Sequence, residues 1–286
     1  MNLSNHNENK PITTALLLAA GTGSRLFPLT QNSPKCLTLV NEKSILERLV
    51  IILKKKGFKR LVIVTGYQEI FIKEFLGTIS GNMTIEYVYS PLYRTTNNIY
   101  SLWMARNIIN EPFVLVESDL VFDASQLDNM LFPDRIAVAP MAPWMNGTSV
   151  LINQFNIVKN FVNSNSIYLG EIRYKTVNIY SFSLSTWHAI IKRLNEYIAT
   201  NNVNIYYEAV LSEMVADGNL SLQTVLFNNK LWYEIDTIED LVEAEKLFPA
   251  EIYETDILDK IILQSNYIPD HFVEKITALE SQNVAS

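Results

Sequence analysis

The residues with the clearest chemical potential lie in one stretch near the start of the chain. The apolar run Leu16 to Ala20 is followed by Gly21 and Gly23, and then by the cations Arg25 and Lys35. Glycines let backbone N–H groups turn toward an anion, and the two cations supply the opposite charge. The stretch therefore predicts a buried strand that leads into a phosphate-binding loop.

Two familiar phosphate loops do not fit this stretch. A P-loop requires four residues between its glycines, followed by Gly-Lys-Ser or Gly-Lys-Thr, and the dinucleotide fingerprint requires a third glycine where Leu26 stands. A strand-to-turn connection without a ligand stays open as the alternative, and Arg25 and Lys35 count against it.

Asp119 and Asp236 are the best pair of candidate metal ligands. Each is expected directly after a strand, where a carboxylate can reach a site. Mg²⁺ takes one or two carboxylates and completes its shell with phosphate oxygens and water. The alternative for each residue is an ordinary helix or turn cap.

The second half of the chain offers two ways to bind a cationic ligand. An aromatic cage could draw on Trp144, Tyr206 and Trp232, whereas Glu208 could pair with an amine. A quaternary ammonium favours the cage and a primary amine favours the carboxylate. Both stay open, as does a purely structural role for each residue.

Composition narrows the class of partner. The chain has 286 residues, a formal net charge of −7 and one cysteine. This charge argues against nucleic acid or a membrane surface as the partner, and the single cysteine favours a reducing cytoplasm. No apolar run reaches the about 18 residues of a membrane span. Only three histidines are present, which argues against a zinc site or a histidine triad.

Strands that alternate with helices predict an α/β fold with a doubly wound sheet. The pattern places a disordered lead-in at 1–12, one domain at 13–248 and a helical extension or linker at 249–286. The expected strands are 13–18, 60–65, 84–89, 113–116, 135–139, 149–152, 157–162, 176–182, 222–227 and 231–235. The expected helices follow Ser44, Tyr67, Asn97 or Asn98, Ser185, Tyr206 and Thr237. In such sheets ligands bind beyond the carboxyl ends of the strands, where the glycine loop and Asp119 both fall.

The stretch Leu18 to Leu26, together with Pro34-Lys35, resembles the signature of nucleotidyltransferases that activate small phosphorylated metabolites. Within that superfamily, residues 96–102, 175–180 and 232–237 are similar to bacterial phosphocholine cytidylyltransferases and 2-aminoethylphosphonate cytidylyltransferases. Glu117-Ser118-Asp119 resembles the Glu-Gly-Asp of the phosphonate relatives, with Ser118 in place of glycine. The resemblance spans roughly residues 14 to 248.

This resemblance implies a Rossmann-like mixed sheet of the nucleotide-diphospho-sugar transferase type, with a smaller α+β part for the substrate. It also implies Mg²⁺-dependent transfer of CMP from CTP to phosphocholine, 2-aminoethylphosphonate or a related amine. A sugar-1-phosphate nucleotidyltransferase is the alternative. The oligomeric state stays open, and a homodimer is among the states that the sequence allows.

The resemblance assigns roles to residues as follows. Arg25 and Lys35 are catalytic, Asp119 and Asp236 hold Mg²⁺, and Lys175 contacts the acceptor. The further acceptor candidates, Trp144, Tyr206, Trp232 and Glu208, come from their residue types as described above. The nucleotide-binding residues are Ala19, Ala20, Gly21, Thr22, Gly23, Ser24 and Asn98.

Overall fold

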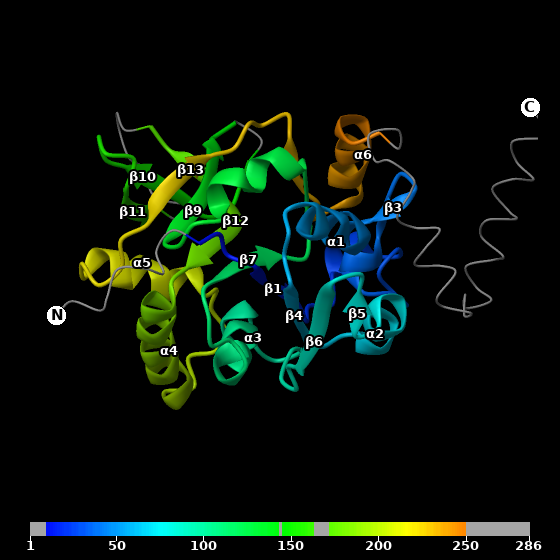
Figure 1. Ribbon diagram of the computed structural model, residues 1–286, viewed down its shortest axis with the longest axis horizontal. Helices are drawn as coiled ribbons and strands as arrows, with labels where there is room; N and C mark the ends of the chain where they lie inside the picture. The colour runs from blue at the N-terminus through cyan, green and yellow to red at the C-terminus, as the bar shows by residue number, and fades with distance from the viewer. Residues whose placement is uncertain (1–9, 143–144, 163–171, 250–286) are drawn as a thin grey trace, which may run out of the picture. The chain divides into compact units, whose positions relative to one another are not determined.

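The computed structural model describes residues 10–142, 145–162 and 172–249. The chain divides into two units, Met1–Pro249 and Ala250–Ser286, and the elements below belong to the first (Figure 1). The helices are α1 (Ile45–Lys55), α2 (Glu69–Leu76), α3 (Asn98–Met104), α4 (Leu184–Ala199), α5 (Glu208–Ala216) and α6 (Ile238–Leu247). In the described residues, none of these helices has the length and apolar character required to cross a membrane.

The strands of the main sheet are β1 (Thr14–Ala19), β4 (Arg60–Thr65), β5 (Ile79–Ser80), β6 (Met83–Tyr89), β7 (Phe113–Glu117), β9 (Arg135–Pro140), β10 (Ser149–Ile152), β11 (Val158–Val162), β12 (Tyr174–Phe182) and β13 (Gln223–Leu226). Their order is β11-β10-β12-β7-β1-β4-β6-β5, and β9 pairs with β12 and β13. Strand β1 runs parallel to β4 and β7, and β4 runs parallel to β6. Strand β12 runs antiparallel to β7. The sheet is therefore mixed, which confirms the predicted fold class.

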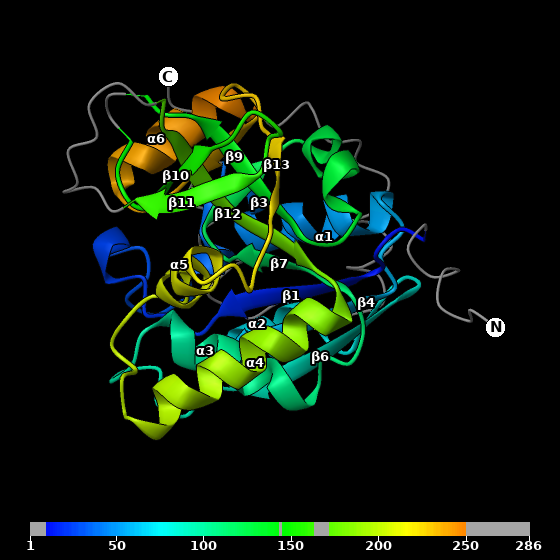
Figure 2. The ribbon, with the colours of Figure 1, turned by 90° about the vertical axis from the view of Figure 1, so that its left-hand side faces the viewer.

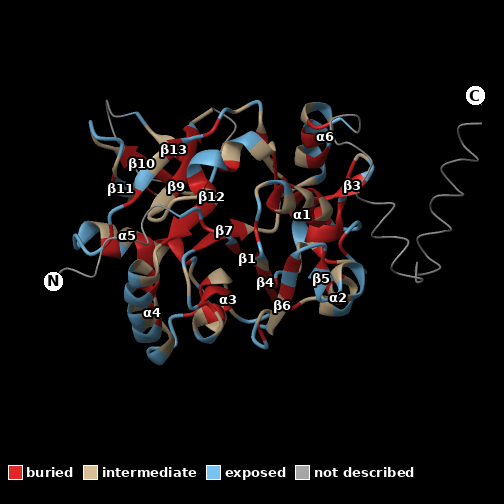
Figure 3. Cartoon of the chain, viewed as in Figure 1, coloured by how far each residue is buried: buried red, intermediate tan, exposed pale blue. Residues whose placement is uncertain are grey.

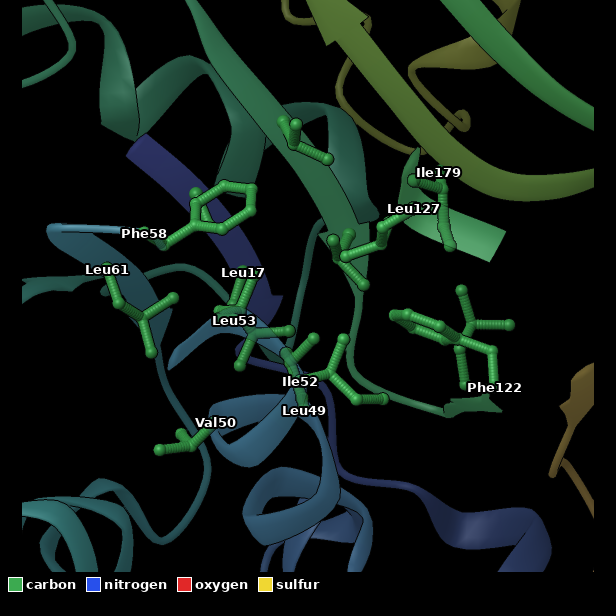
Figure 4. Close-up of a cluster of buried hydrophobic side chains, with 14 of the residues drawn as sticks. Leu17, Leu49, Val50, Ile52, Leu53, Phe58, Leu61, Phe122, Leu127 and Ile179 are labelled. Atoms are coloured by element: carbon green, nitrogen blue, oxygen red, sulfur yellow. The ribbon is translucent and has the colours of Figure 1, made fainter. Parts of the chain in front are cut away.

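Helices cover both faces of the sheet. Alternate residues of β1 point to opposite faces: Leu17 packs in one buried cluster with α1, and Leu16 packs in another with α3 and α4. Figure 2 shows α3 and α4 together on one side of β1. In Figure 3 the central strands are buried almost throughout. Figure 4 shows part of the first cluster, where Leu49 and Leu53 of α1 lie near Leu17. Burial on both faces explains why β1 is an unbroken apolar run.

The helix ends follow their capping residues. The Ser44 hydroxyl accepts a hydrogen bond from the Glu47 N–H at the start of α1, and Thr237 forms a capping box with Asp240 at the start of α6. Helix α4 corrects one expectation. Ser183, not Ser185, caps it, because the Ser183 hydroxyl accepts from the Thr186 N–H.

Short strands were missing from the expectations: β2 (Leu39–Val40), β3 (Lys43–Ser44), β5 and β8 (Leu120–Phe122). Strand β8 matters for the site because it pairs antiparallel with β14 (Trp232–Glu234) in a two-stranded ribbon. The ribbon ends in a hydrogen bond of 2.9 Å from the Ile235 N–H to the Asp119 carbonyl. It therefore joins the segment of Asp119 to that of Asp236.

Candidate active site

The glycine loop begins where β1 ends, and its backbone is closely packed on Lys35. Gly23 has a φ of +63°, and a Cβ there would lie 2.8 Å from Cβ of Lys35. The Thr30 hydroxyl donates a hydrogen bond of 2.7 Å to the Gly23 carbonyl. Only glycine fits this position, since a side chain would meet both the backbone strain and the lysine.

Four charged side chains meet beside this loop. The Lys35 ammonium lies 2.8 Å from Asp119 Oδ2 and 2.8 Å from Asp236 Oδ1. Arg25 approaches the same oxygen of Asp236 at 2.7 Å. The cluster brings together the two predicted catalytic cations and the two predicted metal ligands, which come from separate parts of the chain.

The pairing shifts the ionisation of the cluster. Burial by itself would lower the pKa of Lys35, but the charges of Asp119 and Asp236 and their hydrogen bonds outweigh it and raise that pKa. Burial opposes ionisation of Asp236 as well, and Lys35 and Arg25 nevertheless hold its pKa below the ordinary value. Lys35 and Asp236 are therefore both charged at neutral pH.

The two aspartates fit a hard divalent cation. Oδ1 of Asp119 is buried and has no hydrogen-bond partner among the described residues, so one carboxylate oxygen still needs a ligand. In this part of the chain no group of three or more His, Cys, Asp or Glu side chains forms a metal cluster. A cation at Asp119 and Asp236 would therefore complete its shell with phosphate oxygens and water, as Mg²⁺ does.

A cavity of about 420 Å³ extends from this cluster. The loop residues Gly21 to Arg25 line one end with Lys35, and Lys175, Tyr206 and Glu208 line another part of the wall. The cavity is large enough for a small-molecule ligand.

The wall away from the glycine loop carries a buried lysine among glutamates. The Lys175 ammonium lies 3.1 Å from Glu234 Oε2 and donates a hydrogen bond of 2.9 Å to the Thr176 carbonyl. Burial raises the pKa of Glu208 to about 7, even though Lys175 opposes the shift. Burial, with Asp119 and Glu208 nearby, raises the pKa of Glu117 well above its ordinary value.

Glu117, Asn178 and Glu234 line the cavity and were not among the predicted site residues. Asn178 has a φ of +59° within β12, and its side-chain amide donates a hydrogen bond of 2.9 Å to Glu234 Oε1. The position of Glu117, two residues before Asp119, was the available sequence signal for that residue. The sequence around Asn178 did not indicate its left-handed backbone conformation.

Other predicted residues lie in different surroundings. Trp232 packs in a buried hydrophobic cluster and does not line the cavity, and Ala19 packs in the same cluster while Ala20 lines the wall. Asn98 lines the cavity, but its side chain donates to Glu117 Oε1 at 3.2 Å and accepts from the Tyr207 N–H at 2.9 Å. Trp144 lies outside the described residues.

The comparison with protein families identifies the first part of the chain. Residues 14–134, which include the glycine loop, Lys35 and Asp119, match the family described as nucleotidyl transferase. These residues are therefore similar to a nucleotidyl transferase domain.

Similar proteins extend the likeness beyond the matched domain. The CMP-5'-(3-aminopropyl)phosphonate synthase of Streptomyces rubellomurinus is 28% identical over 274 residues, which cover 89% of this chain and 43% of that protein. The choline-phosphate cytidylyltransferase of Streptococcus pneumoniae is 23% identical over 238 residues, which cover 83% of this chain and 99% of that protein. This chain thus spans less than half of the first relative and nearly all of the second.

The chain also shares its fold with a solved structure. CTP:phosphocholine cytidylyltransferase from Streptococcus pneumoniae superposes with a TM-score of 0.70 at 22% identity, over 82% of this chain and 99% of that one.

Proposed function

We propose that the protein is a Mg²⁺-dependent cytidylyltransferase, which transfers CMP from CTP to a small phosphorylated or phosphonylated amine and releases pyrophosphate. The observation that carries the proposal is the cavity with two differently charged regions. Arg25, Lys35 and the two aspartates lie beside the glycine loop. Lys175 lies among glutamates on the wall away from that loop, which we call the acceptor wall. Relatives that act on a phosphonate and on choline phosphate support the same class of acceptor.

The reaction divides between the two regions. The loop N–H groups of Gly21 to Ser24 and the Arg25 guanidinium bind the triphosphate, and an oxygen of the acceptor phosphoryl or phosphonyl group attacks the α-phosphorus. The bond from the α-phosphorus to the bridging oxygen breaks, and pyrophosphate leaves with that electron pair. The attacking oxygen is anionic at neutral pH, so no general base is required.

The chain's own residues supply positioning and charge. Lys35 neutralises charge that develops near the α-phosphate, and its raised pKa keeps the ammonium protonated. Lys175 orients the acceptor's anionic end. Bound Mg²⁺, held by Asp119 and Asp236, supplies further charge neutralisation on the phosphates. We also propose a cytoplasmic location, because a chain with a single cysteine is typical of a reducing compartment.

The test is release of pyrophosphate with CTP, Mg²⁺ and either phosphocholine or 2-aminoethylphosphonate. We expect turnover that requires all three components, and loss of about a hundredfold or more in kcat for Asp119→Asn, because that change removes a charge from the metal site. Asp217→Asn is the control, since this exposed carboxylate pairs with Arg193 on the surface.

Two outcomes would contradict the proposal. Turnover of a hexose 1-phosphate with another nucleoside triphosphate, without turnover of either amine, would assign the site to sugar nucleotides. An Asp119→Asn variant as active as the control would remove Asp119 from the metal site.

A further inference from the structure

The acceptor wall of the cavity carries more negative than positive side chains. Glu117, Glu208 and Glu234 line it with Lys175 as the cation. Lys175 is matched to Glu234, which it contacts at 3.1 Å, and the Asn178 amide donates to the other oxygen of Glu234. Glu117 Oε1 accepts a hydrogen bond from Asn98 at 3.2 Å.

Glu208 is the carboxylate of this wall whose hydrogen bonding is incomplete. It is the first residue of α5, and it is only 8% exposed. Its Oε2 is buried and has no hydrogen-bond partner among the described residues. A buried carboxylate oxygen without a donor is costly, so the site favours a ligand that brings one.

The aromatic residues of the described part of the chain offer fewer contacts to a quaternary ammonium at this wall. Among the described residues that line the cavity, the aromatic ones are Tyr93 and Tyr206, and Tyr206 is 60% exposed. Tyr93 contacts the segment of Gly66 and Ala20, which lies beside the glycine loop. A trimethylammonium group has no N–H to donate to Oε2 of Glu208.

We infer that the acceptor carries an ammonium group with N–H donors, a primary amine being the best fit, and that Glu208 selects it by a direct charged hydrogen bond. The inference rests on the proposed function and narrows its acceptor to one chemical class. Charge-assisted hydrogen bonds of this kind require both partners to be present, so removing either the N–H or the carboxylate charge loses the discrimination.

The experiment uses 2-aminoethylphosphonate and its mono-, di- and trimethylated ammonium derivatives, with CTP and Mg²⁺. The series removes N–H donors one at a time and keeps the positive charge. We expect kcat/KM to fall about tenfold to a hundredfold from the primary to the trimethylated acceptor, because the Glu208 oxygen loses its donor. Most of the change should lie in KM.

Glu208→Gln is the matched variant. We expect Glu208→Gln to lower kcat/KM for the primary amine about tenfold or more. The kcat/KM for the trimethylated acceptor should change by less than about threefold, so that the enzyme no longer discriminates between the two acceptors. Glu208→Asp keeps the negative charge and should restore part of this discrimination. Glu213→Gln is the control, because this exposed glutamate lies on the same helix and pairs with Arg193. Thermal unfolding of each variant shows whether it is folded.

Three results would overturn the inference. A trimethylated acceptor used as well as the primary amine, or better, would show that N–H donors are not selected. Discrimination that persists in folded Glu208→Gln would remove Glu208 from the selection. In both cases CTP-dependent turnover continues and the proposed function stands. Absence of CTP-dependent turnover with all four acceptors would overturn both.

Discussion

At the scale of single residues, burial of Glu208 links the stability of the fold to pH. Its pKa rises from an ordinary 4.5 to about 7, with burial as the largest cause. Lys175 of β12 opposes the shift and Glu234 of β14 reinforces it, and Glu117 of β7 lies in the same cavity wall. Ionised Glu208 is therefore a cost that the native state carries above pH 7.

The sign of the pH dependence follows from this raised pKa. Between pH 4.5 and 7 the native chain holds a proton that the unfolded chain has lost, so this group makes the free energy of unfolding fall as pH rises through that range. We expect Glu208→Gln to raise the free energy of unfolding by on the order of 3 kcal/mol at pH 8 and to change it little at pH 4.5.

Urea unfolding of the two proteins at both pH values measures the effect. If Glu208→Gln raises the free energy of unfolding by the same amount at pH 4.5 and pH 8, the ionisation of Glu208 is not the source of the gain in stability. Glu213→Gln, on the exposed side of α5, should show no such pH-dependent difference, because that carboxylate is half exposed.

Residue types and their positions at strand ends were enough to predict the charged cluster. Arg25 and Lys35 follow one strand, and Asp119 and Asp236 follow two others, so the topology of an α/β sheet brings them together. Glu117 could not be assigned a role in this way, because its raised pKa comes from burial and from the nearby charges of Asp119 and Glu208. The resemblance to cytidylyltransferases placed Asn98 at the nucleotide, while the structure shows its amide bound to protein partners.

At the scale of elements, the glycine loop and the Lys35 turn support each other. The Lys35–Leu37 turn packs its first residue against Gly23, and the same lysine reaches both aspartates. The position of the Lys35 ammonium thus depends on how closely the loop backbone can approach.

Gly23→Ala tests this dependence. The added Cβ would lie 2.8 Å from Lys35 Cβ at a φ of +63°. We expect kcat/KM to fall about tenfold or more as Lys35 is displaced, with a loss of about 1–2 kcal/mol in stability from the backbone strain.

Gly218→Ala is the matched control for backbone strain. Gly218 has a φ of +73°, but a Cβ there meets nothing within 4 Å. We expect a similar loss of stability in urea unfolding and unchanged turnover. If both variants keep full turnover, the packing of Gly23 on Lys35 has no part in positioning the ammonium.

The longer elements were predictable because their signals are local. The capping residues Ser44 and Thr237 and the period of apolar residues fix α1 and α6 within the sequence itself. Strands of two or three residues, such as β8, contain too few positions to show a period. They are strands because a distant partner, here β14, supplies their hydrogen bonds.

At the scale of the whole molecule, the described residues that line the cavity all belong to the unit Met1–Pro249. The end of this unit is well anchored, since Phe248 is buried with Leu26 and Val40, and its carbonyl accepts a hydrogen bond of 2.9 Å from Asn41. Helix α6 therefore belongs to the fold that positions Asp236.

Truncation after Pro249 tests this boundary, which the sequence placed at 248. We expect the shortened chain to keep a single cooperative unfolding transition and the turnover of the full chain. Truncation after Thr237 should abolish both, because it removes α6 and exposes the cluster that Leu241 and Phe248 fill. Loss of activity in the first truncation, with its unfolding transition intact, would show that residues after 249 contribute to the reaction.

The ribbon of β8 and β14 has a consequence for how the protein is made. Asp119 and Asp236 lie far apart in the chain, and their segments are joined by the ribbon and not by the main sheet. During synthesis, the glycine loop, Lys35 and Asp119 leave the ribosome long before Asp236. A nascent chain can complete its central parallel strands and still lack the second carboxylate. The charged cluster is therefore completed near the end of translation of this unit, when residues 232–234 pair with residues 120–122.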